Sequence, residues 1–571
     1  MIEQLKKNWH LVLYFFLAIF SISPLLSPGF FPMHDDTQVA RVFEMGKSLS
    51  HGMFPVRWVE DLGYGYGYPI FNFYSVLPYY IGGIITSLGV TALDSTKIIF
   101  TIALIGSGVS MFFLAKEFFG KLAGLVSAVI YLYFPYHAIN VYVRGDLAEL
   151  SAYAFLPFAF LSLFKIHKSG AFLKKYVVLG SLSIAAVILS HNLSAFMLFI
   201  FIGIFILASL AFNKGRKILL LPYALILIFA FLFSAFYTLP AIFEMKYTNI
   251  ASIIGGSSYF GDHFVCINQL WDSPWGFGGS APTCVDGMSF KLGKLNVLLF
   301  GISLLLFIIN FKKLKDKLLT VSFIFAGLVF SIFMTLSYSS ILWGLPFMDF
   351  LQFPWRFLSF SGLFLALILG YLVWQVKSST NLVLDKNLLG DRIFYITAFI
   401  IILLTLFYNV RLFEPKTIHD RQSSYYTNEA YLKWTVSRIS DEYLPRNFTT
   451  PSSQASLRET PFDIIKGSGN LVILLNKTSE NRAKVNLSEE GTVRANIAYF
   501  PAWKVYINGR ESSYIIKDNG FYINLTKGEH TLTTKFVQTP VEKISNLLSL
   551  IGLLGIIIVI IPYGKKTRLS S

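Results

Sequence analysis

Two adjacent carboxylates are the residues of this chain best placed to do chemistry. Asp35 and Asp36 follow an apolar stretch that runs from about His10 to Leu26. Neighbouring charges beside a membrane helix are costly and are usually retained for function. A carboxylate at the level of the lipid headgroups can act as a base or bind a metal ion. One of the two could instead cap a short helix, which leaves the other unexplained.

Three further polar groups interrupt apolar stretches: Arg144-Gly145-Asp146-Leu147-Ala148-Glu149, Ser190-His191-Asn192 and Phe353-Pro354-Trp355-Arg356. An arginine at the bilayer edge can clamp a phosphate, so Arg144 and Arg356 are candidate phosphate ligands. Plainer interpretations stay open. Arg144 can pair with Asp146 or Glu149, and Asp146 can cap the next helix. His191 can be a helix-end group, and the Trp355-Arg356 pair an interfacial anchor.

Membrane helices are the elements that must position these residues. The 571 residues are 54% hydrophobic and 14% charged, whereas soluble domains carry about 25% charged residues. The net charge of +16 lies mostly in short loops, which argues against nucleic-acid binding. Apolar stretches of about 20 residues predict about twelve spans: 9–27, 97–115, 122–140, 147–165, 176–191, 193–212, 218–238, 294–310, 319–338, 356–376, 393–410 and 546–563.

The loop charges indicate that a further apolar stretch, 69–88, does not cross. If it stays on one side, the basic clusters all share the side of Lys6 and Lys7, as the positive-inside rule requires. These clusters lie at 116–121, 165–175, 214–217, 312–317 and 565–568. We therefore expect a re-entrant or juxtamembrane segment, and cytoplasmic N- and C-termini. The outer loops 28–96 and 239–293, the turn 139–149 and the segment 411–543 are predicted to lie outside.

The segment 411–543 is predicted to be an extracytoplasmic, mainly β domain. It precedes 544–571, which is predicted to be a last span with a basic cytoplasmic tail. Strands are expected at 494–500, 503–507, 514–516, 521–523 and 531–536, with hairpin turns at Asn508-Gly509 and Asn519-Gly520. We expect a small antiparallel β-sandwich. Cys266 and Cys284 share the loop 239–293 and can form a disulfide if that loop faces outward.

Nucleotide-binding motifs are absent from the sequence. It contains no Walker A loop, no dinucleotide glycine pattern and no G-x-S-x-G elbow. A nucleotide is therefore not expected as the direct substrate. Acids and arginines on the outer face favour a lipid-linked donor that is activated by phosphate.

These residues together resemble the GT-C superfamily of membrane glycosyltransferases. The shared features are paired acids after the first span, a juxtamembrane helix that starts at a proline, and an arginine-bearing turn after the third span. The chain is most similar to the YfhO-like proteins, including membrane proteins labelled "6-pyruvoyl-tetrahydropterin synthase-related". That label implies no activity here, since no pterin-synthase core is visible. Besides the three groups above, the matching residues are His34-Asp35-Asp36, Glu442-Tyr443-Leu444-Pro445 and Phe500-Pro501-Ala502-Trp503-Lys504-Val505.

The resemblance implies a polytopic helical membrane protein with a GT-C-like domain over 1–410. The implied activity is inverting transfer of a sugar from a polyprenyl-phosphate donor to a glycan, lipid or protein acceptor outside the plasma membrane. It implies Asp35 or Asp36 as the catalytic base, and Arg144 and Arg356 as ligands of the donor phosphate. The implied pocket residues are His34, Glu149, His191, Asn192, Trp355 and Tyr443. Where a divalent cation, Mg or Mn, takes part, its candidate ligands are Asp36, Glu149 and His191. The contiguous acids depart from the acid-x-acid pattern of metal-dependent members.

Two other functions stay open from the sequence. One is a transporter or flippase for lipid-linked glycans, which predicts inverted repeats and broken helices. No inverted repeat is evident. The other is a non-catalytic scaffold for envelope assembly, whose β domain would bind polysaccharide. The intact Asp35-Asp36 pair disfavours that scaffold.

Cysteine labelling tests the predicted topology. A cysteine placed at Thr91, just after the stretch 69–88, should react in intact cells with a membrane-impermeant maleimide, because the positive-inside rule places this residue outside. Labelling that requires permeabilised membranes would overturn the interpretation that 69–88 does not cross.

Overall fold

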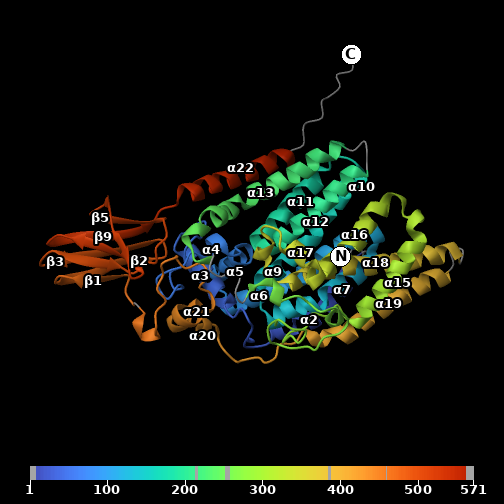
Figure 1. Ribbon diagram of the computed structural model, residues 1–571, viewed down its shortest axis with the longest axis horizontal. Coiled ribbons are helices and arrows are strands. Elements are labelled where there is room, and N and C mark those ends of the chain that lie inside the picture. Colours follow the sequence, from blue (N-terminus) through green and yellow to red (C-terminus); the bar gives the residue numbers. More distant parts are fainter. Residues whose placement is uncertain (1–7, 213–216, 251–257, 384–387, 458, 561–571) are drawn as a thin grey trace, which may run out of the picture.

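The structure is a computed structural model that describes residues 8–212, 217–250, 258–383, 388–457 and 459–560. A bundle of long helices makes up most of the molecule, and a β domain projects from one end (Figure 1). Among the basic residues behind the predicted topology, Lys6, Lys7, Lys214, Arg216 and the tail 561–571 lie outside the described residues.

Within these ranges, ten helices are long and apolar enough to cross a membrane. They are or include α2 (Trp9–Leu26), α6 (Ala92–Phe119), α9 with α10 (Leu147–Tyr153, Leu156–Ser169), α12 (Asn192–Ala211), α13 (Leu220–Phe243), α15 (Lys294–Asn310), α16 (Leu318–Thr335), α18 (Leu358–Val383), α19 (Leu388–Asn409) and α22 (Pro540–Ile560). An eleventh arises if α7 (Lys121–Leu132) and the helix Pro135–Val143, bent by 45°, cross together. The helix α11 (Lys174–Ser190) has 17 residues, so the count of twelve stays a prediction.

The stretch 69–88 is broken into two short helices, α4 (Ile70–Phe73) and α5 (Leu77–Ser87). With 11 residues, α5 rises only about 16 Å, whereas a bilayer core is about 30 Å thick. It packs against α3 (Gln38–Ser50), and a Cβ added at Gly83 would lie 3.0 Å from the nitrogen of Gly46. Glycine therefore allows the close approach of these two helices, and the segment is as irregular as its sequence predicts.

The β domain consists of two antiparallel sheets. One has the order β1 (Phe462–Lys466), β4 (Gly491–Ala495), β8 (Gly520–Leu525), β7 (Ile515–Lys517). The other has the order β2 (Gly469–Lys477), β3 (Glu480–Leu487), β9 (Gly528–Phe536), β5 (Trp503–Ile507), β6 (Arg510–Ser512). Apolar side chains from both sheets, among them Val493 and Val505, are fully buried. Alternating burial along β3 and β9 explains why these segments form half-exposed strands.

The two predicted hairpin turns have different outcomes. Asn508 and Gly509 connect β5 to β6, both with positive φ, as a two-residue turn of this kind requires. The second turn lies one residue earlier than predicted. Lys517 pairs with Gly520, so that Asp518 and Asn519 take the positive-φ positions and Gly520 begins β8. Asp and Asn tolerate the left-handed conformation, which permits this shift.

Strands occupy only 462–536 of the predicted β domain. The preceding part contains the helices α20 (Ser423–Thr427) and α21 (Ser437–Ile439), with a π-helix at Tyr431–Val436 between them. It runs back along the first outer loop. The Tyr431 hydroxyl donates to the Asp36 carbonyl at 3.2 Å, and Arg41 Nη2 donates to Ser440 Oγ at 3.0 Å. Tyr431 and Ser440 therefore attach this part of the chain to α3 and to the loop before it.

A buried polar network joins the last span to the first outer loop. Arg57 donates to Asn72 Oδ1 at 3.1 Å and to Asn546 Oδ1 at 2.9 Å, and Asn72 Nδ2 donates to Glu542 Oε1 at 3.1 Å. The α22 residues Glu542 and Asn546 thus bond to α4 and to the loop before it. Along the same side of the molecule, α22 lies beside α13 (Figure 1). This network, which the sequence patterns do not reveal, positions the chain leaving the β domain.

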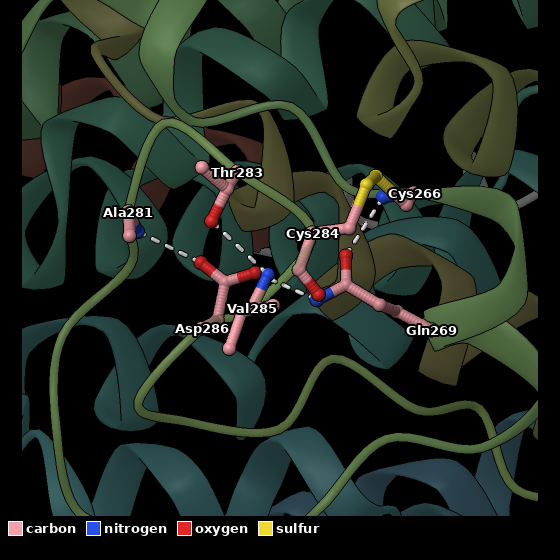
Figure 2. Close-up of a disulfide and its surroundings, with 7 residues drawn as sticks. All are labelled: Cys266, Gln269, Ala281, Thr283, Cys284, Val285 and Asp286. Carbon is pink, nitrogen blue, oxygen red and sulfur yellow. Dashed lines mark hydrogen bonds between the residues drawn. A yellow bond between two sulfur atoms is a disulfide. The ribbon is translucent and has the colours of Figure 1, made fainter.

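Cys266 and Cys284, whose pairing the sequence leaves open, form a disulfide (Figure 2). Gln269 stabilises the loop that the disulfide closes, since its Nε2 donates to the Cys284 carbonyl at 3.1 Å and to Asp286 Oδ2 at 2.6 Å. Asp286 Oδ1 in turn accepts the backbone N–H of Ala281 at 2.8 Å. These bonds hold residues 266–286 in one conformation.

Gly29 gives a test of how the segment 411–461 is attached. Its φ is +73°, and an added Cβ would lie 2.2 Å from the His419 carbonyl oxygen. Gly52 has a similar φ of +84° but open space around it. Gly29→Ala should therefore lower the melting temperature of the purified protein clearly more than Gly52→Ala, whose strain alone costs about 1–2 kcal/mol. Equal losses would contradict the close backbone contact.

Candidate functional site

The core of the site forms where the bent helix Pro135–Val143 meets α9. Asp146 caps α9, because its Oδ1 accepts the backbone N–H of Glu149 at 2.9 Å. Aspartate is favoured at this position, where unpaired N–H groups and the helix dipole attract negative charge. Glu149 lies one turn further along and is fully buried. Two carboxylates are thereby fixed side by side in an apolar environment.

Arg144 forms ion pairs with both carboxylates. Its Nη2 lies 2.7 Å from Asp146 Oδ2, and its Nη1 lies 2.6 Å from Glu149 Oε2. The same Nη1 also donates to Tyr136 and Asn140. The paired interpretation of this turn is thus the one that the structure adopts. With its donors largely in use, Arg144 is less available for the donor phosphate than the sequence predicts.

His191 joins this cluster from the junction of α11 and α12. Its Nδ1 accepts the backbone N–H of Ser194 at 3.2 Å and thereby caps α12. Because Nδ1 accepts this bond, the neutral ring carries its proton on Nε2. The ligand atoms of Asp146, Glu149 and His191 lie within 4.8 Å of one another.

These three residues do not fit a divalent cation in this arrangement. Both Asp146 oxygens are already bonded, and Glu149 Oε1 accepts the Tyr136 and Tyr153 hydroxyls at 3.0 and 2.6 Å. The Arg144 guanidinium contacts both carboxylates and would repel a cation. Asp36, a predicted metal ligand, does not belong to this group. Glu149 and His191 are brought together as predicted, but with Asp146 as the third member.

Asp35 lies along the edge of this cluster. Its backbone N–H donates to the Arg144 carbonyl at 2.9 Å, and that of His34 donates to the Val143 carbonyl at 3.1 Å. Within the described part of the chain, no residue forms a hydrogen bond or ion pair with the Asp35 carboxylate. Burial raises the pKa of this carboxyl and Asp146 raises it further, while Arg144 and Arg41 lower it. Asp35 is therefore a positioned carboxylate without a structural partner.

Asp36 has a different environment from its neighbour. The groups that influence it belong to the segment 411–461: Arg421, Tyr431 and His419. Burial raises the pKa of Asp36 to about 6, although Arg421 lowers it. The two acids, which the sequence does not distinguish, are thus separated by tertiary structure.

Arg356 has a buried donor without a partner, as Arg41, Arg57 and Arg494 also do among the described residues. Its Nη1 donates to the Leu351 carbonyl at 2.6 Å and to Gln352 Oε1 at 3.2 Å, whereas its buried Nε has no partner. The guanidinium lies 5.8 Å from the centre of the Trp355 ring, and that of Arg144 lies 4.7 Å from it. Trp355 therefore connects the two predicted phosphate ligands. The ring of Phe290, from the loop that contains the disulfide, stacks on the Trp355 ring, with 5.8 Å between the ring centres.

Three further predicted pocket residues, His34, Asn192 and Tyr443, form their contacts outside the cluster around Arg144. His34 is exposed, and its Nε2 lies 3.0 Å from the Phe277 carbonyl. Asn192 accepts the Tyr237 hydroxyl at 2.8 Å and donates to the Phe73 carbonyl at 3.4 Å, so it attaches α4 to the spans. The ring of Tyr443 stacks on that of Phe73, with 5.4 Å between the ring centres. The backbone N–H of Tyr443 donates to the Tyr68 hydroxyl at 3.0 Å. Asn192 and Tyr443 both contact Phe73 and so support α4.

Arg41 is a site residue that the sequence analysis did not select. It is 5% exposed, and its guanidinium lies 4.1 Å from the centre of the Tyr74 ring. It also influences the pKa of Asp35, which places it on the same side of the loop. The signal in the sequence is an arginine one and a half turns after Asp35 in a short amphipathic helix. Such a residue is usually solvated, and only the tertiary structure buries this one.

Residues 71–255 match a protein-family model described as "6-pyruvoyl-tetrahydropterin synthase related domain; membrane protein". The matched region contains the Arg144, Asp146, Glu149 and His191 cluster but neither Asp35 nor Arg356. No curated protein matches the chain. This similarity and the apolar helices together indicate an integral membrane protein.

The raised pKa of Asp36 predicts a pH-dependent stability. In the folded protein the Asp36 carboxyl keeps its proton up to about pH 6. In the unfolded chain an aspartate has a pKa of about 3.9 and loses its proton near that pH. The contribution of protonated Asp36 to the free energy of unfolding is therefore complete below about pH 4 and is lost as the pH rises through about 6. Melting temperatures of the wild type and Asp36→Asn, measured from pH 4 to 8, should diverge over this range, with the variant relatively more stable at high pH. Asp262→Asn, at an exposed residue, controls for the loss of one carboxylate. A constant difference across the range would contradict the burial of Asp36.

Proposed function

We propose that the protein is an inverting glycosyltransferase that uses a polyprenyl-phosphate sugar as donor, with Asp35 as the catalytic base. The acceptor is a hydroxyl of an envelope glycan, lipid or protein at the outer face of the plasma membrane. One observation carries the proposal: the Asp35 carboxylate is positioned by its backbone yet has no partner among the described side chains.

The environment of Asp35 suits proton abstraction. An ordinary aspartate is a weak base, but burial raises the pKa of this one and brings it closer to the operating pH. The hydrogen bond from its N–H to the Arg144 carbonyl fixes the backbone. Because a base acts only within hydrogen-bond reach of the proton it removes, such positioning is required for catalysis.

Arg356 is the proposed ligand of the departing phosphate. It is 8% exposed and has an unpaired Nε. Removing an arginine from water without a carboxylate partner is costly, and an anionic ligand would offset that cost. Arg144 contributes positive charge nearby, although its own hydrogen bonds are used within the protein.

The step proposed here is a single displacement. The acceptor oxygen forms a bond to the anomeric carbon as the bond from that carbon to the phosphate oxygen breaks. Asp35 takes the proton from the acceptor hydroxyl, and the polyprenyl phosphate departs with the bonding electron pair. The charge that develops on the phosphate is stabilised by Arg356. No metal ion is required in this scheme, in keeping with the pairing of Arg144 to both nearby acids.

A transfer assay with the purified full-length protein tests the proposal. Polyprenyl-phosphate sugars and extracted envelope acceptors are supplied, and sugar incorporation is measured in the presence of EDTA. Asp35→Asn should reduce the rate by about 10²–10⁴-fold, the usual contribution of a general base. Asp36→Asn, a matched change one residue away, should have a far smaller effect.

Two outcomes would contradict the proposal. Transfer that Asp35→Asn leaves unchanged would exclude this residue as the base. Movement of lipid-linked glycan across vesicle membranes without any transfer to an acceptor would instead favour the transporter. Correct folding of the variants is checked by their melting temperatures, because Asp35 lies beside the buried Arg144 cluster.

A further inference from the structure

A groove of about 890 Å³ lies where α2 ends and α6 begins. Its apolar walls come from Leu25 and Leu26 of α2 and from Ile98 and Ile102 of α6. Both helices are candidate membrane spans, and Leu26 and Ile102 are 66% and 54% exposed. A volume of this size falls in the range of about 300–1,000 Å³ that is common for ligand sites. The groove therefore opens towards the hydrocarbon of the bilayer.

The third wall is the segment 420–424, which is held firmly in place. Phe30 and His419 exchange two backbone hydrogen bonds, at 2.9 and 2.7 Å. Ser423 Oγ accepts the backbone N–H of Leu93 at 3.3 Å, in the first turn of α6. These contacts tie the segment to the ends of both spans, so the groove is a built feature of the fold.

Two cations lie at the polar end of the groove, Lys97 and Arg421. Lys97 is 8% exposed and belongs to a candidate span, and its Nζ donates to the Ser27 carbonyl at 2.8 Å. The Arg421 guanidinium packs on the Tyr425 ring, 4.2 Å from its centre. In the described ranges, no carboxylate forms an ion pair with either residue. Lys97 is the buried one of the two and lies within a candidate span, and such a charge is a functional signal. Arg421 is half-buried in the segment 420–424, and Asp36 lies near it.

The acidic residues of the groove do not neutralise these cations. Asp94 and Asp420 also line it, but both are exposed. Asp94 accepts the Thr91 hydroxyl at 2.7 Å in the first turn of its own helix. Water screens exposed carboxylates, whereas the buried ammonium of Lys97 acts at a lower effective dielectric constant. Asp36 offsets part of the charge of Arg421, so the positive charge of the deeper part of the groove comes mainly from Lys97.

We propose that this groove binds a lipid with an anionic phosphate headgroup. The phosphate oxygens would accept hydrogen bonds from Lys97 and Arg421, and an acyl or prenyl chain would lie against Leu26 and Ile102. Apolar walls on two spans distinguish this ligand from a soluble phosphate. The site is separate from Arg356, the proposed ligand of the donor phosphate, and lipid binding here does not depend on glycosyl transfer.

Photo-crosslinking of the full-length protein in phosphatidylcholine nanodiscs tests this proposal. A diazirine-bearing phosphatidylglycerol, added as a minor component, should label peptides that contain Leu25 to Gly29 or Thr91 to Ile102. Lys97→Met and Arg421→Gln should each reduce labelling by about tenfold, the effect expected from losing one hydrogen bond to a charged group. Lys97→Arg should restore most of it.

The matched control is Lys416→Gln, which removes a positive charge from an exposed residue just before the segment 420–424 and outside the groove lining. Its labelling should equal that of the wild type. Equal labelling by a zwitterionic diazirine phosphatidylcholine would overturn the proposal, as would labelling that survives both cation variants. Competition on the wild-type protein alone gives an independent result. Unlabelled phosphatidylglycerol should displace the probe, and displacement by inorganic phosphate as effective as that by the lipid would show a soluble-anion site instead.

Discussion

The ion pairs of Arg144 with Asp146 and Glu149 are the interaction on which the rest of the candidate site depends. Buried charges at the end of membrane helices are stable only if they are paired with opposite charges and their remaining donors and acceptors are satisfied. Tyr136, Asn140 and Tyr153 complete the cluster with hydrogen bonds. The bent helix before Arg144 and the start of α9 are thereby fixed relative to each other. The backbone carbonyl of Arg144 then positions Asp35.

Arg144 and Arg356 have different roles in this arrangement. Arg144 satisfies the protein's own carboxylates and has a structural role that an incoming phosphate would have to displace. Arg356 bonds to a carbonyl and an amide, both neutral, and so keeps its charge available. Both guanidiniums pack on Trp355, which sets their spacing. The same pairing disfavours a divalent cation at the acidic cluster, because the Arg144 guanidinium already contacts both carboxylates and would repel the cation.

The segment between α19 and the strands has a similar organising effect on the loop after α2. Backbone bonds between Phe30 and His419, and the bond from Tyr431 to the Asp36 carbonyl, hold it against the first outer loop. As a result the two acids have different neighbours: Asp146 and Arg144 influence the pKa of Asp35, whereas Arg421 and Tyr431 influence that of Asp36. The attachment also forms the wall of the groove beside α6. One connection therefore separates the two acids and creates a second polar site.

The sequence by itself determined the features that depend on a few neighbouring residues. Hydropathy over about 20 residues indicates a membrane helix, and the Asn508-Gly509 turn, the Asp146 cap and the irregular stretch 69–88 follow from local chemistry. The shared loop of Cys266 and Cys284 likewise favoured their pairing. The tertiary structure alone decided that the Asp35 carboxylate has no partner among the described side chains, and that Arg144 pairs with the protein's own carboxylates. It also decided that Arg41 is buried. These outcomes depend on contacts between residues such as Tyr431 and Asp36, which are 395 positions apart. Adjacent residues of one type have the same local signal, and only long-range packing gives them different surroundings.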